Sequence, residues 1–218
     1  MQGLTTLHVF TLNQKKDKSM KIKSILATLL ALLFITSTTI AQDVTYTLQE
    51  INEFVIDGDS NVRDWDADVS VSEGTLVLEN IEEFTLENLT PEVFKSLKMT
   101  MPVRQIDSDS RRLNNNLHDY LLKDDHPNIT FELVEITGIE VDGNSAVITA
   151  NGVINAAGVD FTTTMNVNAT LNGDSSITFS GAQDLLMTSF NIDPPTAAFG
   201  TIRAADEMVI RYNVTFRK

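Results

Sequence analysis

The chain has 218 residues, with 16 lysines and arginines against 30 aspartates and glutamates, and it contains no cysteine. A formal net charge of −14 opposes binding to nucleic acid or to an anionic membrane surface. The lack of cysteine excludes disulfides, zinc–thiolate sites and cysteine nucleophiles, so a hydrophobic core must hold the fold together.

The first 41 residues are expected to be a leader. A segment starting at Met20 carries two lysines, then an apolar run over Ile25–Ile35, and it ends in a small-x-small sequence at Ala41. These are the three parts of a secretory signal peptide. The alternative is a membrane anchor, but the run has about a dozen residues and a bilayer-spanning helix needs about 20. We therefore predict export to the periplasm or the medium, no transmembrane anchor after cleavage, and one domain over residues 42–218.

Beyond the leader, apolar and polar residues alternate as they do in β-strands. Short runs come first and predict five strands: Val44–Leu48, Phe54–Ile56, Trp65–Val71, Thr75–Leu78 and Leu97–Val103. Their alternation indicates that one face of each strand is buried and the other is solvated.

The pattern then changes to helical spacing. Apolar residues predict one short helix near residues 111–123: Leu113, Leu117, Tyr120 and Leu121. Asp109 or Ser110 is expected to cap its start. Pro127 cannot continue a helix and favours an extended residue before it, so a strand should follow directly.

The strands expected after the helix alternate more clearly: Ile129–Ile136, Ala146–Ile154, Phe161–Leu171, Ile177–Met187 and Met208–Phe216. Hairpin turns are expected between them, at Asp142-Gly143-Asn144, Ala157-Gly158 and Asn172-Gly173-Asp174. Eight to ten strands in one all-β domain form either a barrel or a sandwich. Several of these strands exceed the usual length of about five or six residues, which favours an antiparallel barrel of about eight strands. The single helix is then well placed to cover one open end.

Several segments occur in the order in which a known family carries them: Gly58–Trp65, Met101–Ser108, Leu117–Phe131, Phe190–Pro195 and Gly200–Asp206. In these segments the chain resembles the YceI-like proteins. The resemblance implies an exported, lipocalin-like barrel, which in several members holds a polyisoprenoid or isoprenoid-quinone chain. Many relatives carry histidine where Arg63 stands, so a role of that imidazole does not carry over.

A long branched hydrocarbon needs a narrow apolar tunnel with few polar groups. The candidate wall residues lie on the apolar strand faces: Met99, Met101, Phe131, Phe161, Met165, Phe179, Ile210 and Tyr212. The candidate residues at the mouth are Leu117, Tyr120, Leu121, Phe190 and Phe199. The same alternation also occurs in a filled barrel, where the first set is ordinary core and the second a plug. A measured cavity separates the two interpretations.

No motif predicts catalysis, a metal or a resident cofactor. His118 and His126 lack a zinc-ligand spacing and are expected at a solvated helix end. The segment Asp107–Arg112 lacks the glycine and the final glutamate of a calcium loop. No serine stands in a Gly-x-Ser-x-Gly elbow.

We therefore predict a non-enzymatic binding protein whose partner is an apolar small molecule or lipid, with a bound isoprenoid as its only candidate cofactor. The first alternative is a filled barrel with a structural or partner-binding role. The second is a hydrolase or isomerase, which requires two carboxylates that face the interior.

Overall fold

The computed structural model describes residues 42–80, 85–173 and 175–218, so the predicted leader lies outside the described residues. The strands are β1 (Val44–Ser60), β2 (Trp65–Asp68), β3 (Glu73–Leu78), β4 (Phe94–Pro102), β5 (Asn128–Asp142), β6 (Ser145–Ala156), β7 (Val159–Leu171), β8 (Ile177–Leu186), β9 (Thr196–Ala197) and β10 (Ile202–Arg217). The helical segments are η1 (Leu86–Asn88), η2 (Pro91–Val93), η3 (Val103–Gln105), α2 (Arg111–Tyr120), η4 (Met187–Phe190) and η5 (Ala198–Gly200).

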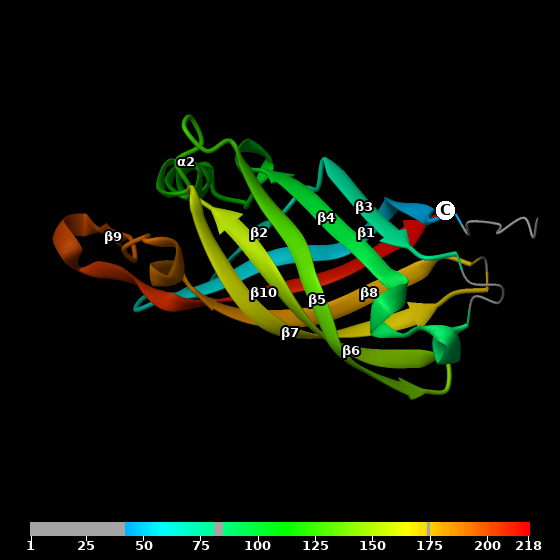
Figure 1. The fold of residues 1–218 in the computed structure, drawn as a ribbon. Helices are drawn as coiled ribbons and strands as arrows, with labels where there is room; N and C mark the ends of the chain where they lie inside the picture. The colour runs from blue at the N-terminus through cyan, green and yellow to red at the C-terminus, as the bar shows by residue number, and fades with distance from the viewer. Residues whose placement is uncertain (1–41, 81–84, 174) are drawn as a thin grey trace, which may run out of the picture. The chain divides into compact units, whose positions relative to one another are not determined.

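The strands form one antiparallel sheet that closes on itself (Figure 1). The sheet order is β2-β1-β3-β4-β5-β6-β7-β8-β10-β9, and β1 also pairs with β10. Eight of the described strands therefore complete the barrel, while β2 pairs with the second half of β1 and β9 with the start of β10. This confirms the predicted all-β, lipocalin-like barrel.

The first strand joins two segments that the alternation pattern separated. Val44–Leu48 and Phe54–Ile56 both belong to β1, whose pairing with β10 shifts register between Leu48 and Glu50 and again between Ile51 and Glu53. Each irregularity adds a residue and reverses which side chains face inward. The strand continues through this region although the period of two does not.

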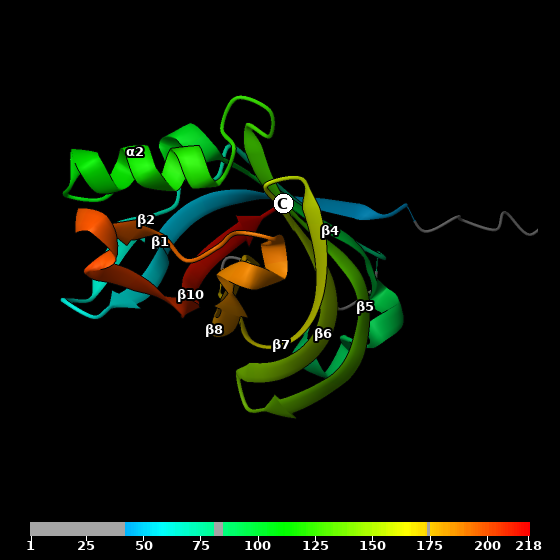
Figure 2. The ribbon, with the colours of Figure 1, turned by 90° about the vertical axis from the view of Figure 1, so that its left-hand side faces the viewer.

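The predicted helix is α2, which lies across one end of the barrel (Figure 2). The side chain of Ser110 accepts a hydrogen bond from the Leu113 backbone N–H at 3.4 Å and so caps the first turn. Leu122 has a positive φ of 55°, which ends the helix at Tyr120, before the expected residue 123. No helix in the described part of the chain is both long and apolar enough to cross a membrane.

His118 links α2 to the end of the η3 turn through a hydrogen bond. Its Nε2 lies 2.8 Å from the backbone oxygen of Ile106, and the residue is half-buried. His126 is also half-buried, and its ring lies where a Cβ at Gly158 would stand, at 2.4 Å. His118 lies in the last turn of α2, as expected, but neither histidine is fully solvated, because both side chains pack against neighbouring turns.

The opposite end of the barrel is closed by apolar side chains. Leu76, Leu78 and Phe216 are almost fully buried there. The short turns η1 and η2 add further buried residues to this end, which lies opposite α2 (Figure 1). Buried apolar side chains therefore fill the end of the barrel that lies opposite α2.

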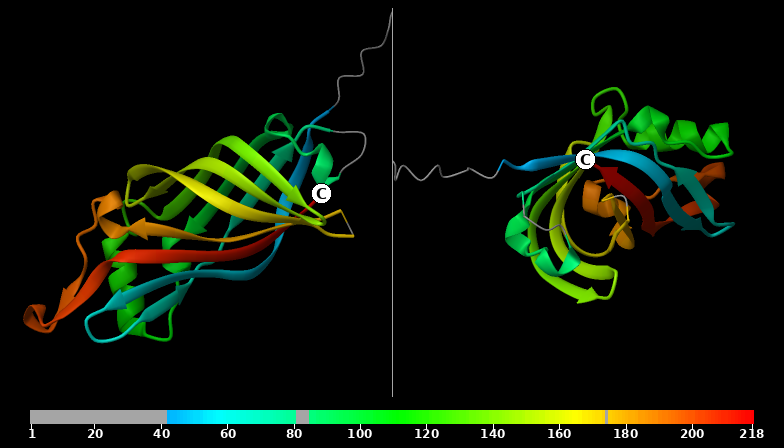
Figure 3. Two further views of the ribbon diagram at one scale, coloured as in Figure 1. Left: turned by 90° about the horizontal axis from the view of Figure 1, so that it is seen from below. Right: turned by 90° about the vertical axis from the view of Figure 1, so that its right-hand side faces the viewer.

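Two neighbouring strands separate toward the α2 end. β7 and β8 pair only from Asn168 opposite Ser180 to Leu171 opposite Ile177. Beyond this point they diverge (Figure 3), and η4 brings Phe190 against Phe161, with 5.6 Å between the ring centroids. Side chains therefore replace backbone hydrogen bonds in this part of the wall.

Truncation at the closed end should destabilise the barrel strongly. Leu76 is 0% exposed, so we expect Leu76→Ala to lower the free energy of unfolding by about 2–5 kcal/mol through lost burial and a residual cavity. Leu186 is 42% exposed, and Leu186→Ala should change it by no more than about 0.5 kcal/mol. Urea denaturation measures both; equal losses would contradict this account of the core.

Candidate ligand-binding site

The barrel encloses a cavity of about 460 Å³. This volume falls within the range of about 300–1,000 Å³ that is usual for small-molecule sites. Its lining includes exposed residues of α2 and of the β1–β2 turn, such as Arg112 and Val62, so the cavity opens at the α2 end. We call this opening the mouth.

Most of the candidate residues line this cavity: Met99, Met101, Phe131, Met165, Phe179, Ile210 and Tyr212 on the strands, and Leu117, Tyr120, Leu121 and Phe190 near the mouth. A role of these residues in binding a ligand stays a prediction. Their placement shows that the alternation of apolar residues identified the inner face correctly.

Two candidate residues lie elsewhere. Phe161 packs edge-on against Phe190 and does not line the cavity. Phe199 is fully exposed in the η5 turn, where its φ is 57°. Tertiary structure decides both positions: Phe161 lies where β7 leaves β8, and the β9–β10 hairpin extends away from the barrel (Figure 1).

β10 runs along the length of the cavity, from the mouth to the closed end. Its inward residues run from Met208 near the mouth, through Ile210, Tyr212 and Val214, to Phe216 at the closed end. Tyr212 stands opposite Gly181 of β8 and Phe54 of β1. At about 3.3 Å per residue, Met208 and Tyr212 are about 13 Å apart along the strand. The cavity is therefore elongated along the barrel.

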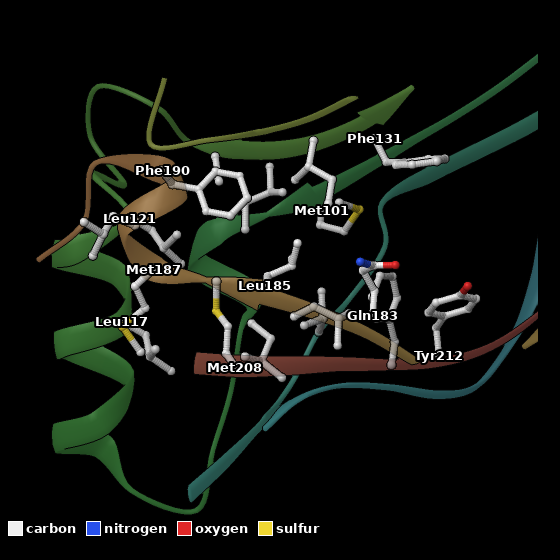
Figure 4. A pocket seen from close by; sticks show the side chains of 18 of the residues that line it. Met101, Leu117, Leu121, Phe131, Gln183, Leu185, Met187, Phe190, Met208 and Tyr212 are labelled. Atoms are coloured by element: carbon white, nitrogen blue, oxygen red, sulfur yellow. The ribbon is translucent and has the colours of Figure 1, made fainter. Parts of the chain in front are cut away.

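The close view in Figure 4 shows the two ends of this cavity. Leu117 from α2, Leu121 just after it, and Met187 and Phe190 from η4 gather at one end, and Tyr212 lies toward the other. The mouth is thus narrowed by side chains from two separate elements.

Sequence reasoning did not single out several lining residues. These are Phe54, Trp65, Gln183, Leu185, Met187 and Met208, among others. Gln183 and Leu185 continue the inward series that Phe179 begins, so a strict period of two would have found them. Trp65 also lies on the apolar face of its predicted strand, alternating with Asp66 and Asp68, and its ring crosses over Gly58, where a Cβ would lie 2.1 Å from it.

Few polar side chains line the cavity, and most of them lie at the mouth and not deep inside. The polar side chains at the mouth, where solvent reaches them, are those of Ser60, Arg63, Ser110, Arg112, Asn116 and Thr196. Farther in, the lining has two polar side chains within the described residues, those of Gln183 and Tyr212. No aspartate or glutamate of the described residues lines the cavity, so the paired inward carboxylates of a hydrolase are not found there.

The described residues also hold no group of three or more histidine, aspartate or glutamate side chains close enough to bind a metal ion. The cavity can therefore bind by shape and by apolar contact, and it presents no acid–base pair within the described residues.

The sequence pattern of the YceI-like domain matches residues 61–216. This chain belongs to the YceI-like family. The match spans most of the barrel and includes nearly all of the cavity lining.

Solved structures share this fold. The crystal structure of BcnA from Burkholderia cenocepacia shares 20% identity at a TM-score of 0.52, covering 74% of this chain and 95% of that one. A polyisoprenoid binding domain from Saccharophagus degradans, implicated in plant cell wall breakdown, shares 8% identity at a TM-score of 0.59, covering 79% and 97%. At these identities the likeness shows a common fold. No functionally curated protein matches this member of the YceI-like family in sequence.

Tyr212 is the most perturbed titratable group of the site. Burial raises the pKa of its phenol from 10.0 to about 12, because the charged form would lose its hydration. The hydroxyl therefore stays protonated and able to donate a hydrogen bond at any ordinary pH.

This pKa predicts a stability change at high pH. The folded protein keeps the Tyr212 proton up to about pH 12, whereas the unfolded chain releases it near 10.0, so the contribution to stability is complete below pH 10 and is lost toward pH 12. The free energy of unfolding should fall less steeply over this window in Tyr212→Phe than in the wild type. Urea denaturation at several pH values tests this, and identical slopes would contradict it.

Proposed function

We propose that this protein is an exported, non-enzymatic carrier that shelters a long apolar molecule, an isoprenoid or isoprenoid-quinone-like lipid, inside its barrel. The observation that carries the proposal is the elongated cavity of about 460 Å³ with an almost wholly apolar wall. A filled barrel with a structural role would have no such space, so the cavity favours the carrier.

The chemistry of the wall suits a flexible hydrocarbon. Each Å² of apolar surface that leaves water contributes about 25 cal/mol, so a chain lying along the barrel gains affinity in proportion to its buried length. Met99, Met101, Met165 and Met208 line the cavity, and their unbranched thioether side chains adapt to an irregular ligand. Binding of this kind selects for length and branching more than for charge.

The comparisons support the same ligand class. The Saccharophagus degradans domain, whose fold this chain shares, is described as polyisoprenoid binding. The sequence of the first 41 residues, with its basic start, apolar run and small-x-small end, supports export. A carrier outside the cytoplasm would keep a prenyl lipid out of water between membranes.

Organic extraction of the protein purified from its native source, followed by mass spectrometry, tests the proposal directly. We expect a prenyl lipid in stoichiometric amount. A preparation that carries no prenyl lipid, and that takes up no prenyl lipid from vesicles, would contradict the proposal.

Filling the cavity with a larger side chain should weaken ligand binding. Ala150 is 3% exposed and lines the cavity, so Ala150→Phe places a ring where the ligand would lie. We expect affinity for a prenyl lipid to fall at least about tenfold, or about 1.4 kcal/mol. Trp65 is the single tryptophan and lines the cavity, so its fluorescence reports uptake.

Ala182→Phe is the matched control for this change. Ala182 is exposed and does not line the cavity, so the same added ring should leave affinity unchanged. Wild-type affinity in Ala150→Phe would show that the ligand lies elsewhere.

A further inference from the structure

The Tyr212 hydroxyl is a polar group inside the barrel that lacks a hydrogen-bond partner among the described residues, and its oxygen is buried. It lies in the cavity wall among apolar side chains, well inside the mouth. A buried hydroxyl in apolar surroundings is unfavourable unless it is hydrogen-bonded, so this group calls for a partner within the cavity.

The position of the phenol is built into the barrel. A Cβ atom at Gly181, opposite Tyr212, would lie 2.6 Å from the hydroxyl oxygen, so only glycine leaves room for the ring. On the other side, the ring of Phe54 meets that of Tyr212 edge-on, with 6.5 Å between the centroids. The hydroxyl is therefore held in one place rather than free to turn toward solvent.

The other polar group in this inner part is uncharged as well. The Gln183 amide nitrogen donates to Thr163 Oγ1 and to the Asp184 carbonyl, each at 3.1 Å. The arginines that line the cavity, Arg63 and Arg112, belong to the β1–β2 turn and to the start of α2, both at the mouth. An anionic head group would thus find its cations at the mouth, whereas a neutral oxygen would find its donor inside.

We propose that the ligand enters head first and places an uncharged oxygen, a carbonyl or a hydroxyl, against the Tyr212 hydroxyl, while its apolar tail runs back past Met208 to the mouth. This inference rests on the proposed carrier function and adds the chemistry and direction of the head group. It also gives the inner hydroxyl the partner that a pure hydrocarbon cannot supply.

Three probes with one branched carbon skeleton separate the possibilities: phytane, a hydrocarbon; phytol, an alcohol; and phytanic acid, a carboxylate. Trp65 fluorescence titrations would compare the wild type with Tyr212→Phe, which removes the hydroxyl and keeps the ring. We expect Tyr212→Phe to weaken phytol by about three- to tenfold, the value of one hydrogen bond, and to leave phytane unchanged.

Tyr46→Phe is the matched control, since Tyr46 is buried but does not line the cavity, and it should leave all three affinities unchanged. Urea midpoints of both variants establish that they fold. Unchanged phytol affinity in Tyr212→Phe overturns the inference, as does tighter binding of phytanic acid than of phytol.

The outcomes also distinguish a failure of this inference from a failure of the proposed carrier function on which it rests. If phytane and phytol both bind and Tyr212→Phe affects neither, the carrier function stands and the head-first orientation falls. If neither binds the wild type and no prenyl lipid is extracted from the native protein, both fall together.

Discussion

The pairing of the first strand with the last is the interaction on which this structure depends. β1 and β10 pair from Thr47 opposite Arg217 to Ser60 opposite Ala204, and this ladder converts an open sheet into a barrel. Ion pairs follow the outer face of the seam, from Arg217 to Glu50 and from Arg211 to Glu53 and Asp57. Such exposed pairs contribute little each, so the hydrogen bonds and the apolar inner face supply most of the stability. Closure turns that inner face into an interior from which water is excluded.

A closed barrel of eight strands has room for a filled core or for one slender ligand. In this barrel the two ends differ in how they are closed. Large side chains meet at the closed end around Phe216, with η1 and η2 beneath them. At the other end β7 and β8 part, and η4 and α2 contribute side chains in place of strand pairing. The cavity runs from this end along the barrel as far as Phe216. Its only inner polar groups in the described chain, Gln183 and Tyr212, then acquire importance, because an apolar wall gives them no alternative partners.

The period of two predicted the barrel and most of the cavity wall from sequence. It succeeded for Met165, Ile210 and Tyr212, because a residue on an uninterrupted strand alternates strictly between the two faces. It failed where pairing is irregular. β1 was read as two strands because its two register shifts interrupt the alternation between Leu48 and Phe54. Phe161 was placed in the cavity although β7 has already left its neighbour there. Phe199 was misplaced because nothing local shows that the β9–β10 hairpin leads away from the barrel.

By itself, the sequence determined the all-β class, most of the strand segments and the position of the single α-helix, since alternation and helical spacing are patterns of neighbouring residues. Whether the barrel is hollow was decided only in three dimensions, because a filled and an open barrel share the same alternation. The position of the Tyr212 hydroxyl was likewise decided by contacts across strands, with Gly181 and Phe54 far away in the chain. Local spacing specifies which way a side chain points, and only packing specifies what it meets.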